Sequence, residues 1–498
     1  MELIQSLVCI LIFIILPLLF LILNTKPKYK LPPGPRPLPI IGNLHNLGRL
    51  PHRALANLSN IYGPLMSLRL GSVPCIVISS PETSKLFLKQ HDLAFASRPA
   101  LQAVKYLWYG GKAVGLAPYG EQWRKVRKLV TLQLLTSKKV DSFEWLRKKE
   151  IDRYIRSLKE ASDVGAVVSA GSIFKELAES IMFKMIVGKG KEDDKRYDLQ
   201  DGVERVLALG GAFNVSDYIP LLAPLDLQGL NRKMKKLSKE VDNTLEAIIE
   251  DHLNGKEFEH NNDLLRIMLD LMKNPTTDLT LDRDTIKAIM LDLFGAGIDT
   301  IGHTIEWALA AMLKDQRILN LLRQEIDSVV GKSRMVQESD FPKLPYLDMV
   351  VKETLRLYPG APLLLPRESI EDVVISGYKI PKKSRLIVNF WGMARDRIVW
   401  GENAEEFYPE RFKNGVNGSG QHFEYIPFGA GRRICAGEYL GTVTVKIVVA
   451  RMVHCFDWKL AENEKPEDMD MSERFGISIP RIAKLLVIPS YRLQVPCS

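Results

Sequence analysis

One cysteine of this chain stands in a setting that favours metal chemistry. Cys435 follows two arginines in the glycine-rich segment 428–437, and the apolar run that begins near Tyr439 predicts a helix directly after it. The dipole of that helix and the nearby cations favour a thiolate over a thiol. The glycines let a flat cofactor lie close to the loop and let backbone N–H groups point at the sulfur. We therefore expect Cys435 to be a metal ligand; a buried structural cysteine is the alternative.

The segment resembles the haem-binding signature of the cytochrome P450 family, Phe-x-x-Gly-x-Arg-x-Cys-x-Gly. The defined positions are occupied by Phe428, Gly431, Arg433, Cys435 and Gly437. The resemblance implies that these residues bind haem b and that Cys435 is the axial ligand to its iron, where thiolate donation favours O–O cleavage. Ala436 is a departure, since plant members more often have proline there, but it removes no ligand.

A second motif lies at residues 295–300, within a predicted helix. Ala296, Asp299 and Thr300 fit the family's oxygen-activation motif, Ala-Gly-x-Asp/Glu-Thr. The resemblance implies that the Thr300 hydroxyl donates to oxygen at the iron and that Asp299 relays protons from solvent. Small residues here leave room beside the iron and can open the helix locally, although close helix packing also explains them. His303 would close the site if it were a second ligand, so we expect an ordinary hydrogen-bonded histidine.

Three residues resemble the family's contacts to the haem propionates. Trp123 and Arg127 are i,i+4 neighbours on a predicted helix and match its Trp-x-x-x-Arg pair. Arg367 matches an arginine in the segment that passes over the haem. From the residue types alone, a tryptophan and an arginine on a helix are more often packing and a solvated charge.

A structural motif is also present. Glu353 and Arg356 are spaced i,i+3, and as an exposed pair they would contribute only about 0.2–0.5 kcal/mol. They resemble the family's Glu-x-x-Arg motif, which implies a buried triad with Arg411. Loss of one member of such a network costs roughly 3–5 kcal/mol.

The remaining chain predicts a mainly helical framework. Helical patterns dominate residues 151–314, residues 81–91 predict a further helix, and 98–120 predict a long functional loop. Alternating and β-rich runs predict strands at 65–70, 75–79, 372–380 and 384–390. The resemblance implies the cytochrome P450 fold, mainly α with small β-sheets. Residues 46–498 then form one catalytic haem domain, because motifs far apart in the sequence must meet at one haem.

An apolar segment at the N-terminus is long enough to cross a membrane. Residues 7–23 contain no charged or strongly polar side chain, and with Leu3 and Ile4 the apolar stretch reaches about 21 residues, roughly 30 Å as a helix. No small-residue cleavage site follows, so we expect a retained transmembrane signal anchor at 1–24. Residues 25–45 are basic and proline-rich, which predicts a semi-rigid hinge.

Charges beside this segment predict its orientation. Lys26, Lys28 and Lys30 follow it and Glu2 precedes it, so the positive-inside rule leaves the N-terminus lumenal. Microsomal members of the family carry a similar hinge. We therefore expect a single-pass protein of the endoplasmic reticulum membrane with a cytosolic catalytic domain.

Composition limits the class of function. The chain has 498 residues and a net charge of +9, with basic and acidic residues interleaved, so we assign no nucleic-acid partner. Its five cysteines have no paired spacing, which argues against a disulfide framework or a zinc site. The basic excess suits membrane lipid or an acidic protein partner.

A group of basic residues accompanies Trp123. It consists of Arg124, Lys125, Lys128, Lys138 and Lys139. The resemblance implies that this surface lies on the thiolate side of the haem, where an acidic NADPH-cytochrome reductase docks transiently.

The resemblance also implies a substrate pocket on the other side of the haem. Its lining would be Phe213, Ala296, Ala361, Leu363, Leu364, Leu365 and Ile477. None of these side chains is ionisable, so burial of an unpaired substrate charge among them would be strongly unfavourable. We expect a lipophilic plant specialised metabolite, such as a terpenoid, an alkaloid free base or a phenolic.

The sequence therefore predicts a haem-thiolate monooxygenase that uses O2 and NADPH-derived electrons to hydroxylate or otherwise oxidise such a substrate. Two rivals are a reductase-independent haem-thiolate isomerase or dehydratase and a non-catalytic haem-binding protein. Thr300 and the basic surface argue against the first rival, and NADPH consumption with a substrate-induced spin shift would exclude the second.

Overall fold

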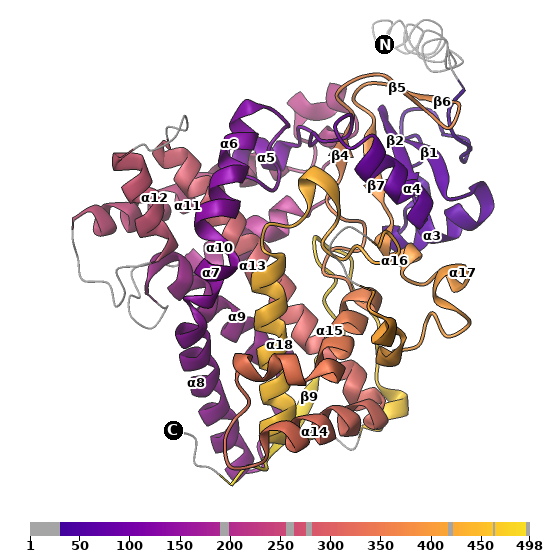
Figure 1. Ribbon diagram of the computed structural model, residues 1–498. Helices are drawn as coiled ribbons and strands as arrows, with labels where there is room; N and C mark the ends of the chain where they lie inside the picture. Colours follow the sequence, from indigo (N-terminus) through magenta and orange to yellow (C-terminus); the bar gives the residue numbers. More distant parts are fainter. Residues whose placement is uncertain are drawn as a thin grey trace, which may run out of the picture.

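The computed structural model describes residues 30–189, 199–254, 263–274, 281–416, 422–461 and 464–494. This part of the chain is mainly helical with three small sheets, as the sequence predicts (Figure 1). The predicted anchor at 1–24 and the first five residues of the hinge lie outside the described residues. None of the helices in the described ranges is both long enough and apolar enough to cross a membrane.

The longest helix, α13 (Arg283–Lys314), lies at the centre of the molecule (Figure 1). Its 32 residues extend about 48 Å, and most of their side chains are buried because apolar residues surround the helix on all sides. Around it lie α3 (Pro51–Tyr62), α4 (Pro81–Lys85), α5 (Gln102–Leu107), α6 (Glu121–Leu129), α7 (Ser137–Asp141), α8 (Glu144–Asp163), α9 (Ala170–Val187), α10 (Leu199–Gly210), α11 (Leu230–Leu253), α12 (Leu264–Lys273), α14 (Gln316–Val330), α15 (Pro345–Leu357), α16 (Phe390–Met393), α17 (Arg397–Trp400) and α18 (Glu438–Cys455). Helix α13 packs most extensively against α9 and also contacts α10, α15 and α18.

The strands form three separate sheets. Their bounds are β1 (Leu65–Leu70), β2 (Val73–Ile78), β3 (Val168–Ser169), β4 (Arg367–Glu368), β5 (Val373–Ile375), β6 (Tyr378–Ile380), β7 (Arg385–Val388), β8 (Phe456–Leu460) and β9 (Leu486–Tyr491). The sheets have the orders β1-β2-β7-β4, β3-β9-β8 and β5-β6, and β2 pairs with β7 in parallel. The predicted strands at 65–70, 75–79 and 384–390 are thus confirmed to within a few residues. The run predicted at 372–380 is instead divided into the antiparallel strands β5 and β6 by a turn at Ser376 and Gly377, which both have positive φ.

The turn between β1 and β2 holds two other segments against the sheet. Gly71 has φ +62°, and a Cβ there would lie 2.3 Å from the carbonyl oxygen of Tyr218. Ser72 N–H donates to that same oxygen at 2.8 Å, and Gly71 N–H donates to the carbonyl of Ile41 at 3.0 Å. The second half of the predicted hinge and the segment around Tyr218 therefore meet at this turn.

The predicted loop at 98–120 contains helix α5, which the sequence analysis did not predict. Six residues are too few to show a helical period. The first N–H of α5, at Gln102, donates to the carboxylate of Asp217 at 2.8 Å. A residue 115 positions away thus satisfies the helix start, which no local pattern reveals.

A buried charge network joins α15 to the segment before the cysteine loop. Glu353 and Arg356 are fully buried and form two hydrogen bonds of 2.7 and 2.8 Å, while Arg411 Nε donates to Glu353 at 3.0 Å. Backbone carbonyls, including that of Ala404 at 2.7 Å, accept the remaining Arg356 protons. One carboxylate therefore balances two buried arginines.

Replacement of Glu353 by Gln should destabilise the fold by roughly 3–5 kcal/mol, because it keeps the side-chain size but leaves two buried cations without a counter-charge. The free energy of unfolding from urea titration measures this loss. Glu402→Gln is the matched control, since Glu402 is 92% exposed and lies 3.6 Å from Arg397, a pair worth less than about 1 kcal/mol. Equal losses in the two variants would contradict the role of the network.

Candidate functional site

Cys435 lies in a tight loop, three residues before the start of α18. Its N–H donates to the carbonyl of Phe428 at 2.9 Å, and Ile434 N–H donates to Gly431 at 3.0 Å, closing a 3-10 turn at Gly431–Arg433. The Cys435 side chain is accessible to solvent although protein surrounds it on every side. It therefore faces an internal space and not the outer surface.

The electrostatic setting of the sulfur is partly as predicted. The N–H of Gly437 and the guanidinium of Arg127 both lower the pKa of the Cys435 thiol, but burial is the larger effect and raises its pKa above the ordinary value. The loop N–H and the nearby cation therefore act in the predicted direction, and burial opposes them. A bound metal cation would add further positive charge, since a coordinating thiol is deprotonated outright.

Position 431 requires glycine, because the backbone there has a positive φ and lies close to Leu88 and Asp92. The φ of Gly431 is +68°, and a Cβ there would lie 2.3 Å from the carbonyl oxygen of Leu88 and 2.5 Å from Oδ1 of Asp92. Asp92 also accepts the backbone N–H of Arg432 at 3.0 Å. The segment that follows α4 is thus pressed against the cysteine loop.

Four arginines from four segments gather around this loop. Arg433 donates to the carbonyls of residues 96, 114 and 117 and stacks on the ring of Trp123 at 4.0 Å. Arg127 donates to the carbonyl of Ile434 at 2.7 Å. Arg367 donates to Asp92 at 2.8 Å, and Arg98 donates to the carbonyls of residues 115, 365 and 366.

This cluster holds more positive than negative charge. Arg98, Arg367 and Arg433 are all at least nine-tenths buried. Asp92 accepts a hydrogen bond from Arg367 and its charge acts on Arg433, while the charge of Asp292 acts on Arg98. Burial lowers the pKa of each guanidinium, and Asp92 opposes this at Arg367. Neighbouring arginines lower the pKa of Arg98 and of Arg433 further, and the pKa of Arg433 falls to about 9. Such a site suits a ligand with carboxylates of its own. An accessible cysteine beside buried arginines fits a haem, whose iron takes the sulfur and whose propionates take the cations.

The structure places the three predicted propionate contacts around this cluster. Trp123 and Arg127 lie on α6, where Trp123 Nε1 donates to the carbonyl of Val114 at 3.1 Å and Arg127 reaches the cysteine loop. Arg367 lies at the start of β4 and bonds to Asp92 and to the carbonyl of Ala430. Their guanidinium and indole groups hold the loops that surround Cys435.

Helix α13 brings the second motif to the same region. Thr300 Oγ1 donates to the carbonyl of Ala296 at 2.5 Å, and the Ala296 side chain is exposed. A Cβ on Gly360 would lie 3.6 Å from the Cβ and the methyl carbon of Thr300, so the segment after α15 passes beside this side chain. The helix is continuous through the motif. The local opening that the sequence suggests does not occur.

The glycines of this motif serve helix packing. A Cβ on Gly297 would lie 2.7 Å from the sulfur of Met182 on α9, and one on Gly295 would lie 3.0 Å from Leu207 on α10. These contacts match the packing explanation of the small residues. Asp299 lies on the α9 side of α13, where its charge contributes to the raised pKa of Lys175 and opposes the lowering of the His303 pKa by burial.

The predicted substrate-pocket residues occupy several environments. Phe213 stacks on Tyr218 at 5.0 Å, and Ile477 approaches Gly211 in the same segment. Leu364 adopts φ +50° and its Cδ1 lies 3.9 Å from a Cβ built on Gly429 in the cysteine loop. Leu363 packs with a cluster beneath the β1–β2 hairpin, while Ala361 and Leu365 are half-buried.

The sequence analysis missed three residues of the site. Arg98 and Asp92 are described above, and Asp292 on α13 accepts the N–H groups of Val114 and Gly115 at 2.8 and 2.7 Å. Asp292 thus ties the loop at 98–120 to the central helix. A signal was present for two of them, because an acidic and a basic residue flank an apolar run at 93–96.

Comparison with known proteins gives one family. The family model for cytochrome P450 matches residues 32–486. Cytochrome P450 CYP736A12 of Panax ginseng is 48% identical, covering 96% of this chain and 99% of that protein. The flavonoid 3'-monooxygenase CYP75B137 of Crocosmia x crocosmiiflora is 40% identical, covering 93% of each. The 3,9-dihydroxypterocarpan 6A-monooxygenase of Glycine max is 39% identical, covering 95% of this chain and 96% of that protein.

Cys435→Ala should abolish the red-shifted Soret band of the reduced, CO-bound protein, because the shift requires a thiolate ligand to the iron. Difference spectra of the purified protein measure the band. Cys75→Ala is the control, since Cys75 is buried in β2 and far along the chain from the loop, and it should keep the band. A band that persists in Cys435→Ala would show that another residue ligates the iron.

Proposed function

This chain belongs to the cytochrome P450 family and is a plant P450 monooxygenase, and from that premise we propose that it oxidises a neutral, mostly apolar specialised metabolite at carbon. It uses haem and takes NADPH-derived electrons through a reductase. The substrate proposal rests chiefly on the side chains around Thr300, where the segment 361–365 offers only alanine, proline and leucine. Relatives named for a flavonoid and a pterocarpan substrate are consistent with it.

The proposed division of labour follows from the site. Haem, when bound, supplies the oxygen chemistry, which inserts one oxygen atom into the substrate and releases the other as water. Cys435 would hold its iron, and Arg98, Arg127, Arg367 and Arg433 would hold its carboxylates. Asp299 and Thr300 would hold and pass protons at the adjacent oxygen, since Thr300 Oγ1 already lies in a hydrogen bond that it can exchange.

Substrate affinity would come from apolar burial. Each large apolar contact that is fully buried contributes on the order of 1.5–3 kcal/mol, so two or three such contacts hold a lipophilic molecule. Phe213 and Ile477 are 49% and 39% exposed, and both carry apolar surface that a substrate would cover. A charged substrate would have to leave water without a partner among these side chains.

The reductase is proposed to dock on the basic residues of α6 and α7. Arg127 ties α6 to the cysteine loop, and Tyr439 at the start of α18 donates to Asp141 of α7 at 2.8 Å. Both helices therefore lie beside Cys435. The exposed cations Arg124, Lys128 and Lys138 give this face the charge that an acidic flavoprotein domain would recognise.

We propose that the protein associates with the endoplasmic reticulum membrane, because two segments expose apolar side chains. Leu38, Ile40 and Ile41 of the hinge are 46%, 49% and 39% exposed. Leu221 and Leu225, in the segment that follows Tyr218, are 90% and 60% exposed. Both segments meet at the β1–β2 turn, so these side chains support contact with lipid beside the predicted anchor.

Leu364→Phe should change the position of oxidation or exclude the substrate, because it adds bulk beside the cysteine loop while the CO band stays intact. Product mass and regiochemistry from reductase-containing microsomes, screened against neutral lipophilic metabolites, measure the effect. Leu321→Phe on α14 is the control at an exposed leucine. Turnover of small charged acids, unaffected by the Leu364 change, would contradict the proposed substrate class.

Asn57 should remain unglycosylated when the full chain is made in microsomes. It begins the sequon Asn57-Leu58-Ser59 and is exposed on α3, so a lumenal body would present it to the transferase. An unchanged mobility after endoglycosidase treatment is the expected result. Asn214 is a poorer probe, because it is 3% exposed. Glycosylation at Asn57 would reverse the proposed orientation.

A further inference from the structure

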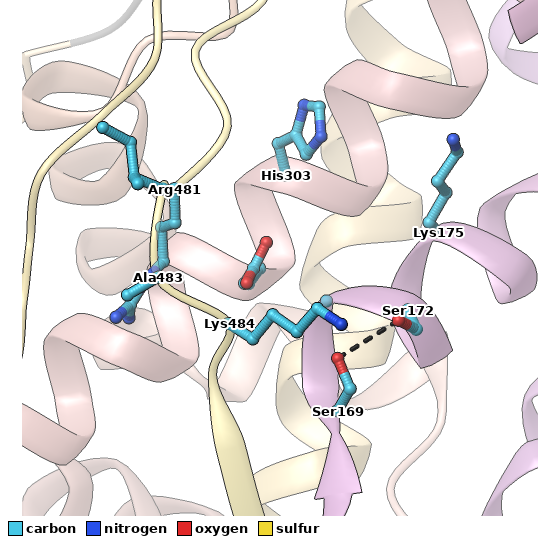
Figure 2. Close-up of a pocket in the computed structure, with 10 residues that line it drawn as sticks. Ser169, Ser172, Lys175, His303, Arg481, Ala483 and Lys484 are labelled. Carbon is cyan, nitrogen blue, oxygen red and sulfur yellow. Dashed lines mark hydrogen bonds between the residues drawn. The ribbon is translucent and has the colours of Figure 1, made fainter.

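Helix α13 carries a polar stripe on the side of Asp299. Asp299, His303 and Glu306 are spaced four and three residues apart, which places them on one face of the helix. That face looks toward the start of α9 and toward the segment before β9, and a pocket of about 210 Å³ lies between them (Figure 2). His303 and Glu306 line this pocket, and Asp299 lies one turn further along the helix.

The pocket is open to solvent and has His303 and Glu306 of α13 in its lining. At its mouth Ser172 and Lys484 are exposed, and Lys484 extends toward Ser169 and Ser172 (Figure 2). At its inner end Glu306 is 8% exposed and His303 is half-buried. One water occupies about 30 Å³ in the liquid, so the volume suffices for a short chain of water molecules among polar partners.

His303 stands at the end of the pocket nearest to Asp299. Its Nδ1 lies 3.0 Å from Oγ of Ser478, which fixes the ring and leaves Nε2 as the second proton site. Burial lowers the pKa of His303. The charges of Lys175 and Arg474 lower it further, whereas the charge of Asp299 raises it. The ring is therefore neutral near pH 7 and can accept a proton at one nitrogen while it releases one from the other.

Two further ionisable groups share the site. Lys175 on α9 lines the pocket and donates to Glu204 at 2.8 Å, while the charge of Asp299 raises its pKa. Burial raises the pKa of Glu306, which Arg481 and the N–H of Leu485 oppose. The polar groups from α13, α9 and the segment 474–485 thus converge on the path from the mouth to Asp299.

Asp299 in turn adjoins Thr300, whose methyl group faces the opposite region near Gly360 and whose hydroxyl donates to the carbonyl of Ala296. Two consecutive residues of one helix point to different sides, so the pair bridges the pocket and the cofactor site. We propose that this pocket is the proton inlet of the reaction and that His303 passes protons from its water to Asp299. The inference rests on the roles proposed above for Asp299 and Thr300, and it does not depend on the substrate class.

The reaction requires such an inlet. Each turnover combines one substrate C–H bond, one O2, two electrons and two protons into one hydroxylated product and one water. When proton delivery to the correct oxygen fails, the same two electrons and two protons leave with O2 as hydrogen peroxide. His303 is a positioning and proton-carrying residue that acts through Asp299, and NADPH supplies the electrons.

His303→Gln tests the proposal, because an amide can keep the bond to Ser478 but cannot gain or lose a proton at neutral pH. With the holoenzyme and reductase, product per NADPH should fall, peroxide should rise and the solvent isotope effect on turnover should increase. We expect a roughly tenfold slower product formation, less than the typical loss of a general acid, because water still bridges the gap. Substrate affinity and the CO band should not change. Ser478→Ala should give a smaller effect in the same direction.

His45→Gln is the matched control, since His45 is exposed and its Nδ1 lies 3.1 Å from the carbonyl of Gly42. Asp299→Asn and Thr300→Ala are measured beside it. If these two variants uncouple the reaction while His303→Gln behaves as His45→Gln, the inlet is overturned and the roles of Asp299 and Thr300 stand. If none of them uncouples it, those roles fail and the inlet fails with them.

A spectroscopic readout tests the coupling without turnover. In the reduced, CO-bound holoprotein with isotope-labelled histidine, the NMR signal of His303 is the one that disappears in His303→Gln. Asp299→Asn should lower the pKa of His303, because the carboxylate that raises it is gone while Lys175 and Arg474 remain. An unchanged His303 pKa would show that the two groups are not connected and would overturn the proposal.

Discussion

Buried positive charge around the Cys435 loop is the constraint on which the site depends. Arg98, Arg367 and Arg433 lie within one region of the interior, each at least nine-tenths buried, and Asp92 accepts a hydrogen bond from Arg367. Burial of an unpaired cation is costly, so each guanidinium must be surrounded by acceptors from several parts of the chain. The loops at 92–98 and 114–117 and the segment 365–367 supply those acceptors.

The same constraint explains how remote segments meet. Gly431 lets the cysteine loop approach the carbonyl of Leu88, and Asp292 holds the loop at 98–120 onto α13. Helix α13 then has two working sides. Thr300 faces the segment after α15, while Asp299 faces the polar pocket beside α9. Helix α13 therefore lies between the cofactor region and the path to solvent. Its neighbouring residues Asp299 and Thr300 connect the two.

Local patterns predicted the parts of the structure that are local. The β1–β2 hairpin around Gly71 and the strands near 372–390 follow from alternation and turn residues, and the family motifs lie on the elements expected for them. Helix α5 was not predicted, because the residue that caps it, Asp217, lies 115 residues away in the sequence. The same reason explains why the site roles of three residues were not predicted. The partners of Arg98, Asp92 and Asp292 are carbonyls and N–H groups of distant loops. The rise that burial causes in the thiol pKa of Cys435 could not be predicted, because burial is a property of the fold and not of the loop.

The buried arginines are expected to bind the carboxylates of the cofactor. Reconstitution of the apoprotein with haem and with haem dimethyl ester, whose propionates carry no charge, tests it most directly. The two ligands share iron and macrocycle, so Cys435 can bind either one. The account predicts that the ester binds about ten- to a hundredfold more weakly, because charge-assisted hydrogen bonds to the arginines are lost. Equal affinity for haem and its ester would contradict it.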